Sequence, residues 1–332
     1  MQTRKPTGRA PWPMLLLAGA EKAGKSWAAA EATGSDLIRN AYWLSIGEDD
    51  PDEYAQIPGA DFQIVEHDGT YKAVLDTVRE VAALPQEDGR PDLLIVDSMG
   101  RLWSQLSDMA QAEANERAAA KARKYGRNAP EDDVQIGMDL WNRAKGRWGD
   151  VLDALRSFPG PVILTARLSV VTVMDAEGKP TKETRDKVEA EKNLPYDVGA
   201  VVKLPERGVA ILSGVRSTKL QMERPTKLQH FTVANLWEAM GVGADATPER
   251  SHAGQPTETP EATEARSAEQ QWLDKIHAAQ DRAALSRLFE QAKELGVNRH
   301  AGIYAAFQQR GADLDAEQPR QVLEGDVVGG QA

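Results

Sequence analysis

The octet Gly19-Ala20-Glu21-Lys22-Ala23-Gly24-Lys25-Ser26 lies between an apolar run at residues 14–18 and an alanine-rich stretch that starts at Trp27 and stops at Gly34. Its spacing fits the pattern G-x-x-x-x-G-K-[ST], in which the backbone N–H groups of a glycine-rich loop surround nucleotide phosphates. The apolar run predicts a buried strand, and the alanine-rich stretch predicts a helix. Because strand, loop and helix form the context of a phosphate-binding loop, the sequence favours a P-loop over a chance Gly/Ala-rich turn.

Each part of this loop has an expected role. The backbone of the loop would bind phosphate oxygens, and the N-terminus of the following helix would add partial positive charge at the same place. Lys25 would reach the β- and γ-phosphates and act in catalysis, while the Ser26 hydroxyl would ligate Mg²⁺. The predicted nucleotide contacts in this segment are Gly19, Ala20, Glu21, Lys22, Ala23, Gly24, Lys25, Ser26 and Trp27.

Composition limits the other classes of site. The chain has 332 residues, 41% of them hydrophobic, which is enough for one large domain with an appendage. It contains no cysteine, so disulfides and thiolate metal sites are excluded, and its five histidines have no metal-ligand spacing. The net charge of −11 argues against a wholly basic nucleic-acid-binding surface but leaves local basic segments open. No apolar run is long enough for a membrane span, and we expect a cytoplasmic protein without a membrane partner.

Apolar runs alternate with helical patterns from Pro13 to about Leu236, which is typical of an α/β fold with a mostly parallel central sheet. Strands are expected at residues 14–18, 41–46, 62–65, 93–97, 161–166, 200–204 and 209–213. Helices are expected at residues 25–33, 71–84 and 138–158. Residues 205–208 read as a turn that joins the last two strands into a C-terminal antiparallel hairpin. Trp141 and Trp148 lie on one helix face, where core packing explains them better than base stacking.

Changes in composition divide the chain into five segments. Residues 1–11 form a flexible basic lead-in, and residues 12–240 form the nucleotide-binding domain. Residues 241–267 almost lack bulky apolar side chains, which predicts a disordered linker. Apolar residues at helical spacing then predict a small all-α module at 268–312, before a disordered tail at 313–332. The module is a candidate for docking a protein partner or for oligomerisation.

The run Leu93-Leu94-Ile95-Val96-Asp97-Ser98 carries the second strong signal. Aliphatic residues that end in an acid are typical of a central strand whose tip holds Mg²⁺ through a carboxylate, so Asp97 joins Ser26 as a predicted metal residue. The alternative is an ordinary strand end with an Asp-Ser turn. Asp97-Ser98-Met99-Gly100 also fits the D-x-x-G of small GTPases, but no N/T-K-x-D motif follows, and the L-S-G-G-Q signature of transporter ATPases is missing. Elimination therefore favours ATP with Mg²⁺.

An acidic cluster follows the strand expected at residues 41–46, and it lies between the P-loop and Asp97 in the sequence. With the late hairpin and the basic residues after it, this layout resembles the RecA-type ATPases over roughly residues 12–236. More narrowly, it is similar to phage-encoded RecA-like ATPases of single-strand annealing and recombination. The resemblance implies a RecA-like P-loop core in which Glu48 activates the attacking water. Asp49 is the fallback if the strand ends one residue later, and a solvated acidic turn is the alternative for the cluster.

The same resemblance implies residues that contact the γ-phosphate. Thr165 and Arg167 lie at the end of the strand expected at 161–166, where the family has a polar sensor, although RecA itself has a glutamine-type residue there. Arg216 and Lys219 follow the last hairpin, where the family directs basic residues to the nucleotide of a neighbouring subunit. Positive charge at that place would stabilise the charge that builds on the γ-phosphoryl oxygens. A homo-oligomer, ring or filament, is implied, and a solvent-exposed basic turn is the alternative.

Two segments are candidates for DNA binding. Residues 117–127 contain five cations, one aromatic residue and no acid, as expected of a phosphate track with a base-stacking platform. We expect an irregular segment there, with contacts from Arg117, Lys121, Arg123, Lys124, Tyr125 and Arg127. The alternative is a solvated helix face. Residues 167–195 have mixed charge and read as a mobile hairpin or loop, which is a second candidate.

These features predict an ATP-dependent, single-stranded-DNA-binding RecA-like recombination or annealing protein that hydrolyses ATP at subunit interfaces to control DNA binding. If the chain is phage-encoded, it works in the cytoplasm of the bacterial host. One alternative is a ring-forming helicase or motor ATPase of the same fold. Another is a regulatory or scaffold ATPase that does not bind DNA.

Overall fold

The computed structural model describes residues 3, 5–85, 89–175, 178–243, 272–273, 275–276, 278–279, 281–297 and 301–317. The chain divides into two compact units, residues 1–254 and residues 255–332. We describe each unit by itself. Most of the linker expected at 241–267 and most of the tail expected at 313–332 lie outside the described residues.

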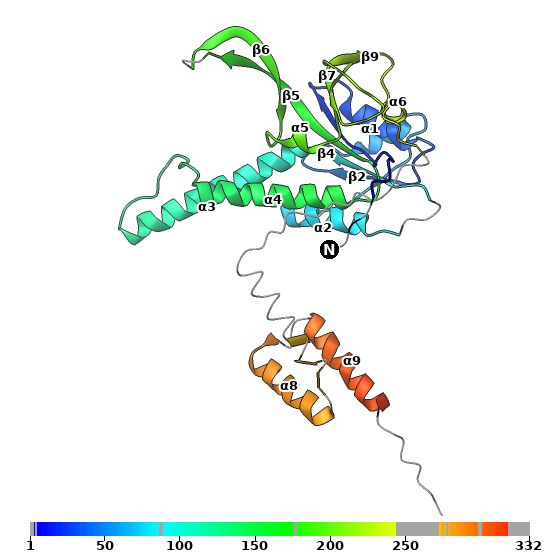
Figure 1. Ribbon diagram of the computed structural model, residues 1–332. Coiled ribbons are helices and arrows are strands. Elements are labelled where there is room, and N and C mark those ends of the chain that lie inside the picture. Colours follow the sequence, from blue (N-terminus) through cyan, green and yellow to red (C-terminus); the bar gives the residue numbers. More distant parts are fainter. Residues whose placement is uncertain are drawn as a thin grey trace, which may run out of the picture. The chain divides into compact units, whose positions relative to one another are not determined.

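A central sheet organises the first unit (Figure 1). Within the described residues its strand order is β3-β2-β4-β5-β1-β7-β8-β9, and β6 pairs with β5 outside this path. Strands β1, β2, β3, β4, β5 and β7 pair in parallel, whereas β6, β8 and β9 pair antiparallel. The strands are β1 (Met14–Gly19), β2 (Ala41–Ser45), β3 (Gln63–Ile64), β4 (Leu93–Asp97), β5 (Val162–Met174), β6 (Pro180–Glu189), β7 (Ala200–Glu206), β8 (Val209–Val215) and β9 (Thr226–Leu228). The predicted α/β class, with a mostly parallel sheet and a late antiparallel hairpin, is confirmed.

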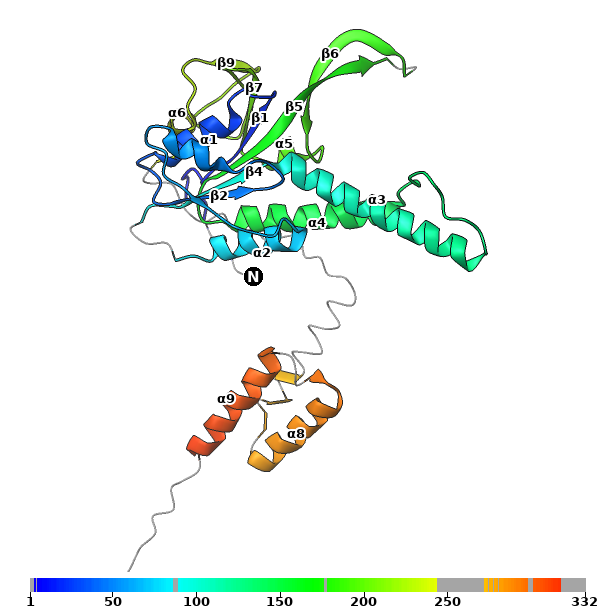
Figure 2. The ribbon, with the colours of Figure 1, turned by 180° about the vertical axis from the view of Figure 1, so that it is seen from behind.

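Helices cover both faces of this sheet (Figures 1 and 2). Every residue of β1 is buried, because β1 lies between β5 and β7 and is covered on both sides, which explains its continuous apolar sequence. Leu16 faces the cluster formed with α2, α3 and α4, whereas Leu15 and Leu17 face the cluster formed with α1 and α6. The helices are α1 (Lys25–Thr33), α2 (Tyr71–Ala82), α3 (Met99–Lys124), α4 (Met138–Ser157), α5 (Leu194–Asp197) and α6 (Val233–Ala239), with a 3₁₀ turn, η1, at Pro51–Gln56.

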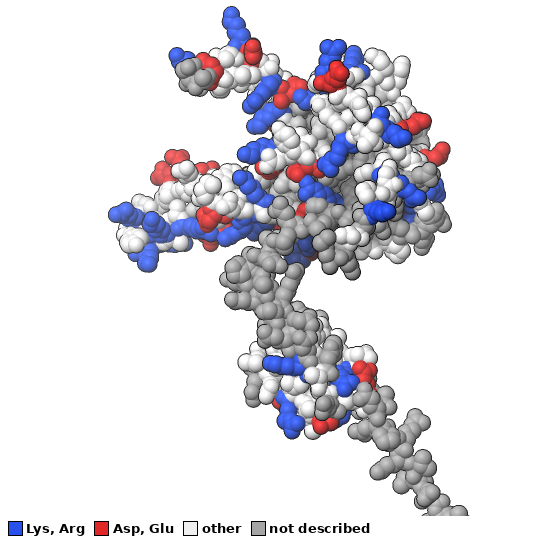
Figure 3. Space-filling view, viewed as in Figure 1, with Lys and Arg blue, Asp and Glu red and all other residues white. Residues whose placement is uncertain are grey.

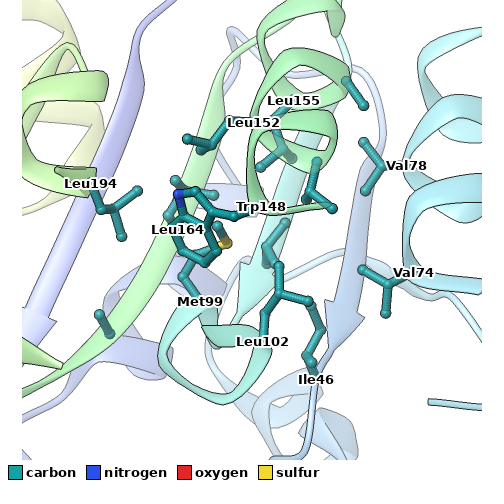
Figure 4. Packing of buried hydrophobic residues seen from close by; sticks show 14 of the residues in the cluster. Ile46, Val74, Val78, Met99, Leu102, Trp148, Leu152, Leu155, Leu164 and Leu194 are labelled. Carbon is teal, nitrogen blue, oxygen red and sulfur yellow. The ribbon is translucent and has the colours of Figure 1, made fainter. Parts of the chain in front are cut away.

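The start of α3 packs into the apolar cluster that α2, α3 and α4 form with the sheet (Figure 4). Met99 and Leu102 of α3 are fully buried and pack with Leu164 of β5 and with Trp148 of α4. The Trp103 and Trp141 rings are stacked, with their centroids 6.2 Å apart. The expectation that Trp141 and Trp148 serve core packing is therefore confirmed.

Two segments differ from what the sequence predicts. Residues 117–124 are not irregular, because α3 continues to Lys124 and only Tyr125 to Arg127 leave the helix. Strand β5 does not stop at 166 but runs on to Met174, and beyond Arg167 it pairs with β6 alone. Residues 167–189 are thus a two-stranded hairpin that curves away from the sheet, one of the two forms expected for that segment (Figure 1).

The second unit contains α8 (Arg282–Glu294) and α9 (Ala301–Glu317). Ile276, Leu285 and Phe307 are among the residues of its apolar core, and the Phe289 and Phe307 rings meet edge to face. Helix α9 passes the boundary expected at 312. In the first unit, Val242 is buried against the core, so packed chain also continues past the boundary expected at 240. No helix among the described residues has the length and apolar character that a membrane span requires.

Candidate nucleotide site

The P-loop joins β1 to α1 beside the neighbouring strand β7. Gly24 has φ +98°, which a residue with a side chain rarely adopts. A Cβ on Gly19 would lie 2.9 Å from Lys25 Cγ and 3.1 Å from the Leu204 carbonyl oxygen, so a side chain there would displace Lys25 and crowd β7. The Ala20 N–H donates to the same Leu204 oxygen at 3.0 Å and is engaged by β7. The backbone conformation at Gly24 and the close contacts at Gly19 therefore explain why both positions carry glycine.

Lys25 is hydrogen-bonded to the backbone of the P-loop. Its Nζ donates to the carbonyl oxygens of Gly19 and Ala20 at 3.2 and 3.0 Å. Burial lowers the pKa of Lys25, while the carboxylates of Asp97 and Glu48 act in the opposite direction. A partly desolvated ammonium at a helix N-terminus is well suited to bind an anionic phosphate chain.

Asp97 accepts hydrogen bonds from two hydroxyl groups, one carried by helix α1 and one by strand β5. Ser26 Oγ donates to Asp97 Oδ2 at 2.7 Å, and Thr165 Oγ1 donates to Asp97 Oδ1 at 2.5 Å. Strand β5, which carries Thr165, pairs in parallel with both β1 and β4, so the P-loop, Thr165 and Asp97 lie at the carboxyl end of three adjacent strands. Burial raises the pKa of Asp97, and the hydrogen bonds from Thr165 and Ser26 lower it. Thr165 is fully buried, and its hydroxyl contacts Asp97.

These oxygen donors fit the cofactor that the sequence predicts. Mg²⁺ prefers hard oxygen ligands and is usually held by one or two protein groups together with substrate phosphates and waters. The Ser26 hydroxyl and the Asp97 carboxylate supply such donors next to Lys25. Ser26 and Asp97 are therefore the residues that would hold the metal.

Glu48 is held by side chains from two other elements. It accepts a hydrogen bond from Ser98 Oγ at 3.0 Å, and Arg167 Nη2 donates to both its carboxylate oxygens at 3.2 and 3.3 Å. Arg101 Nε lies 3.5 Å from the same carboxylate. These partners come from the start of α3 and from β5, so Glu48 touches the bases of both projecting elements.

The cavity that joins these groups has a volume of about 740 Å³. The strand-end order β2-β4-β5 brings Glu48, Asp97 and Arg167 to it, and the P-loop contributes Lys25 and Ser26. Other carboxylates also line it: Glu21, Asp49, Asp50, Glu53 and Glu189. The structure thus places both Glu48 and its fallback Asp49 at one cavity with the P-loop.

Sequence reasoning missed two partners of Glu48, namely Ser98 and Arg101. Ser98 is the N-cap of α3, and its Oγ also accepts from the Arg101 N–H at 3.4 Å. A serine directly before a helix is a recognisable N-cap signal. That signal predicts the helix start, but the contact with Glu48 depends on β2 and β4 being neighbours.

The structure does not bring Arg216 and Lys219 to the P-loop of their own chain. Both are exposed and follow β8, and neither lines the cavities at the P-loop. Arg216 instead borders a separate groove of about 210 Å³ together with Tyr196. A catalytic role for Arg216 and Lys219 therefore depends on a second copy of the chain.

The predicted DNA-binding residues fall into two groups. Arg117 Nη1 donates to Asp139 at 2.5 Å, and Arg117 Nη2 donates to Glu113 at 2.8 Å, so Arg117 ties α3 to α4. The hydrogen bond to Asp139 raises the pKa of Arg117. The others lie exposed at the outer end of α3, where Figure 3 shows Lys and Arg gathered: Lys121, Arg123, Lys124, Tyr125 and Arg127. We call these five residues the α3 tip.

Comparison with known proteins gives limited information. No protein-family model matches the chain, and no curated protein matches it. Among solved structures, the crystal structure of the RadB recombinase is similar over 67% of this chain and 86% of that chain, with 18% identity and a TM-score of 0.37. The flagellar accessory protein FlaH from Methanocaldococcus jannaschii is similar over 67% of this chain and 88% of that chain, with 12% identity and a TM-score of 0.31. Similarities this distant assign no function to the chain.

Proposed function

We propose that this chain is a Mg²⁺-dependent ATPase of the RecA-like type. One observation carries the proposal: the hydroxyls of Ser26 and Thr165 both donate to Asp97, which lines one cavity together with Lys25 and Glu48. An ordinary acidic turn gives no reason for a buried carboxylate to collect hydroxyl donors from the P-loop helix and from a second strand. In P-loop NTPases the P-loop Ser or Thr and a strand-end Asp hold Mg²⁺ together, which supports the same role for Ser26 and Asp97.

The side chains divide the work of hydrolysis. Lys25 binds the phosphate chain and stabilises the charge that develops on it in the transition state. Bound Mg²⁺ would neutralise further charge on the β- and γ-oxygens. Glu48 accepts a proton from the attacking water, which requires that its carboxylate exchange at least one of its present donors for that water. Arg167 is the donor that we expect to leave, because it lines the cavity and its guanidinium would be attracted to a γ-phosphate.

We further propose that the protein binds single-stranded DNA for recombination or annealing, as a homo-oligomer in which Arg216 and Lys219 reach the nucleotide of the neighbouring subunit. The α3 tip supports DNA binding, because its cations make no ion pair within the described part of the chain and surround an exposed tyrosine. Glu48 contacts the base of α3 as well as β5, which gives a physical route between the tip and hydrolysis.

The deciding experiment measures ATP hydrolysis by the full chain with and without single-stranded DNA. We expect Mg²⁺-dependent turnover that DNA increases and that Lys25→Ala abolishes. If DNA does not change turnover and no salt-sensitive DNA binding is found, the result would favour a regulatory or scaffold ATPase. Strand unwinding without a homologous partner would favour a motor over a recombination protein.

A further inference from the structure

Glu48 has two arginine partners, but they differ in their relation to the proposed nucleotide cavity. Arg167 Nη2 lies 3.2 Å from Glu48 Oε1, and Arg101 Nε lies 3.5 Å from the same oxygen. Arg167 belongs to the wall of the cavity, whereas Arg101 is not among the described residues that line it. Arg101 therefore contacts the predicted base from outside the space that a nucleotide would occupy.

The side chain of Arg101 also lies against the chain just before Glu48. Gly47 has φ +61°, and a Cβ there would lie 3.3 Å from both Cβ and Cγ of Arg101. Because glycine has no Cβ and adopts positive φ readily, it allows the chain that leaves β2 to pass close to the Arg101 stem. Arg101 thus contacts this segment twice, with its stem at Gly47 and with its guanidinium at the Glu48 carboxylate.

The backbone that carries Arg101 is fixed by close packing. Met99 and Leu102 are fully buried in the apolar cluster (Figure 4). A Cβ on Gly100 would lie 2.5 Å from the Glu189 carbonyl oxygen, so the first turn of α3 lies directly against the end of β6. The first turn of α3 is therefore a rigid support for the side chain of Arg101.

Such a support is needed at one stage of the proposed reaction. When Arg167 leaves Glu48 to make room for the attacking water, Ser98 and Arg101 remain as partners of the carboxylate. A general base must lie within hydrogen-bond reach of the proton that it removes, and a displacement of about 1 Å can cost about 10²-fold in rate. Because a guanidinium does not act as a base in proteins, Arg101 can hold Glu48 without competing for the proton.

We propose that Arg101 is a positioning residue for hydrolysis, which holds the Glu48 carboxylate toward the attacking water after Arg167 has turned to the nucleotide. The inference rests on the proposed ATPase function and gives the two arginines different tasks. Arg167 contacts the γ-phosphate, so its loss weakens nucleotide binding. Arg101 acts only through Glu48, so its loss lowers the rate of turnover and leaves nucleotide binding intact.

Steady-state hydrolysis by the full chain, together with Mg·ATPγS titration, separates these two tasks. Arg101→Gln should lower kcat by about 10- to 100-fold, the cost of a poorly placed base, and leave KM and the Kd for Mg·ATPγS unchanged. Arg101→Lys should restore part of kcat, because it keeps a positive charge beside Glu48 but not the planar guanidinium. Arg167→Gln should instead raise the Kd for Mg·ATPγS.

Arg143 provides a matched control. Its side chain is 47% exposed, as is that of Arg101, and it forms an ion pair with Glu113 of α3 at 2.6 Å. It is not among the described residues that line the nucleotide cavity. Arg143→Gln should therefore leave kcat and KM at their wild-type values. A fall in kcat as large as that of Arg101→Gln would show that loss of any ion pair to α3 suffices, and would overturn the positioning role.

A double-mutant cycle shows whether Arg101 acts through Glu48. In single-turnover experiments on the Glu48→Gln background, which lacks the base, Arg101→Gln should cause little further loss of rate. Equal fold losses in the wild-type and Glu48→Gln backgrounds, a rise in KM without a fall in kcat, or unchanged turnover of Arg101→Gln would each overturn the positioning role and leave the ATPase proposal intact. Absence of Mg²⁺-dependent turnover by the wild-type chain would overturn both.

Discussion

Charged side chains mark both the nucleotide site and the α3 tip in the sequence, but the structure places them in opposite ways. At the nucleotide site, Asp97 and Glu48 are held by partners from other strands and helices, up to 119 residues away in the chain. At the tip, Lys121 and Arg123 extend into solvent, and no ion pair within the described residues holds them. The fixed geometry of the nucleotide site supports a specific chemical reaction. The exposed cations of the α3 tip support only an attraction for negative charge.

The largest expected effect is a loss of ATP turnover, and it comes from a substitution at the nucleotide site. Glu48→Gln keeps the size and the acceptor oxygen of the side chain but cannot take a proton from water. We expect turnover to fall by roughly 10² to 10⁴-fold, the usual contribution of a general base. Binding of Mg·ATPγS should persist, because Lys25, Ser26 and Asp97 are untouched.

The matched control is Asp49→Asn, which alters the neighbouring carboxylate in the same cavity. Steady-state hydrolysis and ATPγS titration of both variants decide whether Glu48 or Asp49 is the base. If Asp49→Asn abolishes turnover and Glu48→Gln does not, the assignment of the base moves by one residue.

At the tip we expect a smaller effect with a different signature. Combined alanine substitution of Lys121, Arg123 and Lys124 should weaken binding to single-stranded DNA mostly at low salt. If all three contact phosphates, the slope of log K against log salt should become shallower by about 2, since each contact contributes about 0.7. Titrations at several salt concentrations measure this slope. An unchanged slope would show that the tip is only a solvated helix end.

Arg117→Ala tests whether Arg117 is correctly separated from the predicted DNA-binding residues of the α3 tip. Because Arg117 already pairs with Glu113 and Asp139, we expect the DNA salt slope to stay as in the wild type. The thermal midpoint should fall slightly, since the substitution unties α3 from α4. A fall in the salt slope without loss of stability would return Arg117 to the DNA-binding group.

The same contrast explains how much could be predicted from the sequence. The P-loop and β4 follow from local pattern: glycine spacing, an aliphatic run and a terminal acid are visible within a few residues. The hold of Ser98, Arg101 and Arg167 on Glu48 could not be predicted, because it depends on the lateral order of β2, β4 and β5. That order joins residues 50 and 119 positions apart in the chain.

The sequence of residues 117–124 contains a helix signal, but the expectation of an irregular DNA-binding segment was given more weight. Residues 117–124 are rich in alanine, and the basic residues of the last turn, Lys121, Arg123 and Lys124, suit the negative end of a helix dipole. The expectation of an irregular DNA-binding loop overrode this local signal. By contrast, the run Val170 to Val173 is β-branched throughout, which favours the strand extension that the structure has.

The smallest expected effect concerns the stability of the site before it binds a ligand. Because burial raises the pKa of Asp97 above its ordinary value of 3.8, the folded protein binds this proton more tightly than the unfolded chain does. The stabilisation is therefore fully present below about pH 3.8 and is lost as the pH rises through the folded pKa. At neutral pH an ionised, desolvated Asp97 is a cost to the protein without nucleotide.

Asp97→Asn removes that charge and should raise the thermal midpoint at neutral pH in the absence of ligand, with a difference that shrinks on acidification. In the presence of Mg·ATPγS the order should reverse, since the wild type gains RT ln(1 + [L]/Kd) and the variant has lost a metal ligand. Thermal unfolding of both proteins across pH, with and without Mg·ATPγS, measures both differences. If the variant were less stable at neutral pH without ligand, the two hydroxyl donors would outweigh burial, and Asp97 would be a structural carboxylate rather than one kept ionised for a metal.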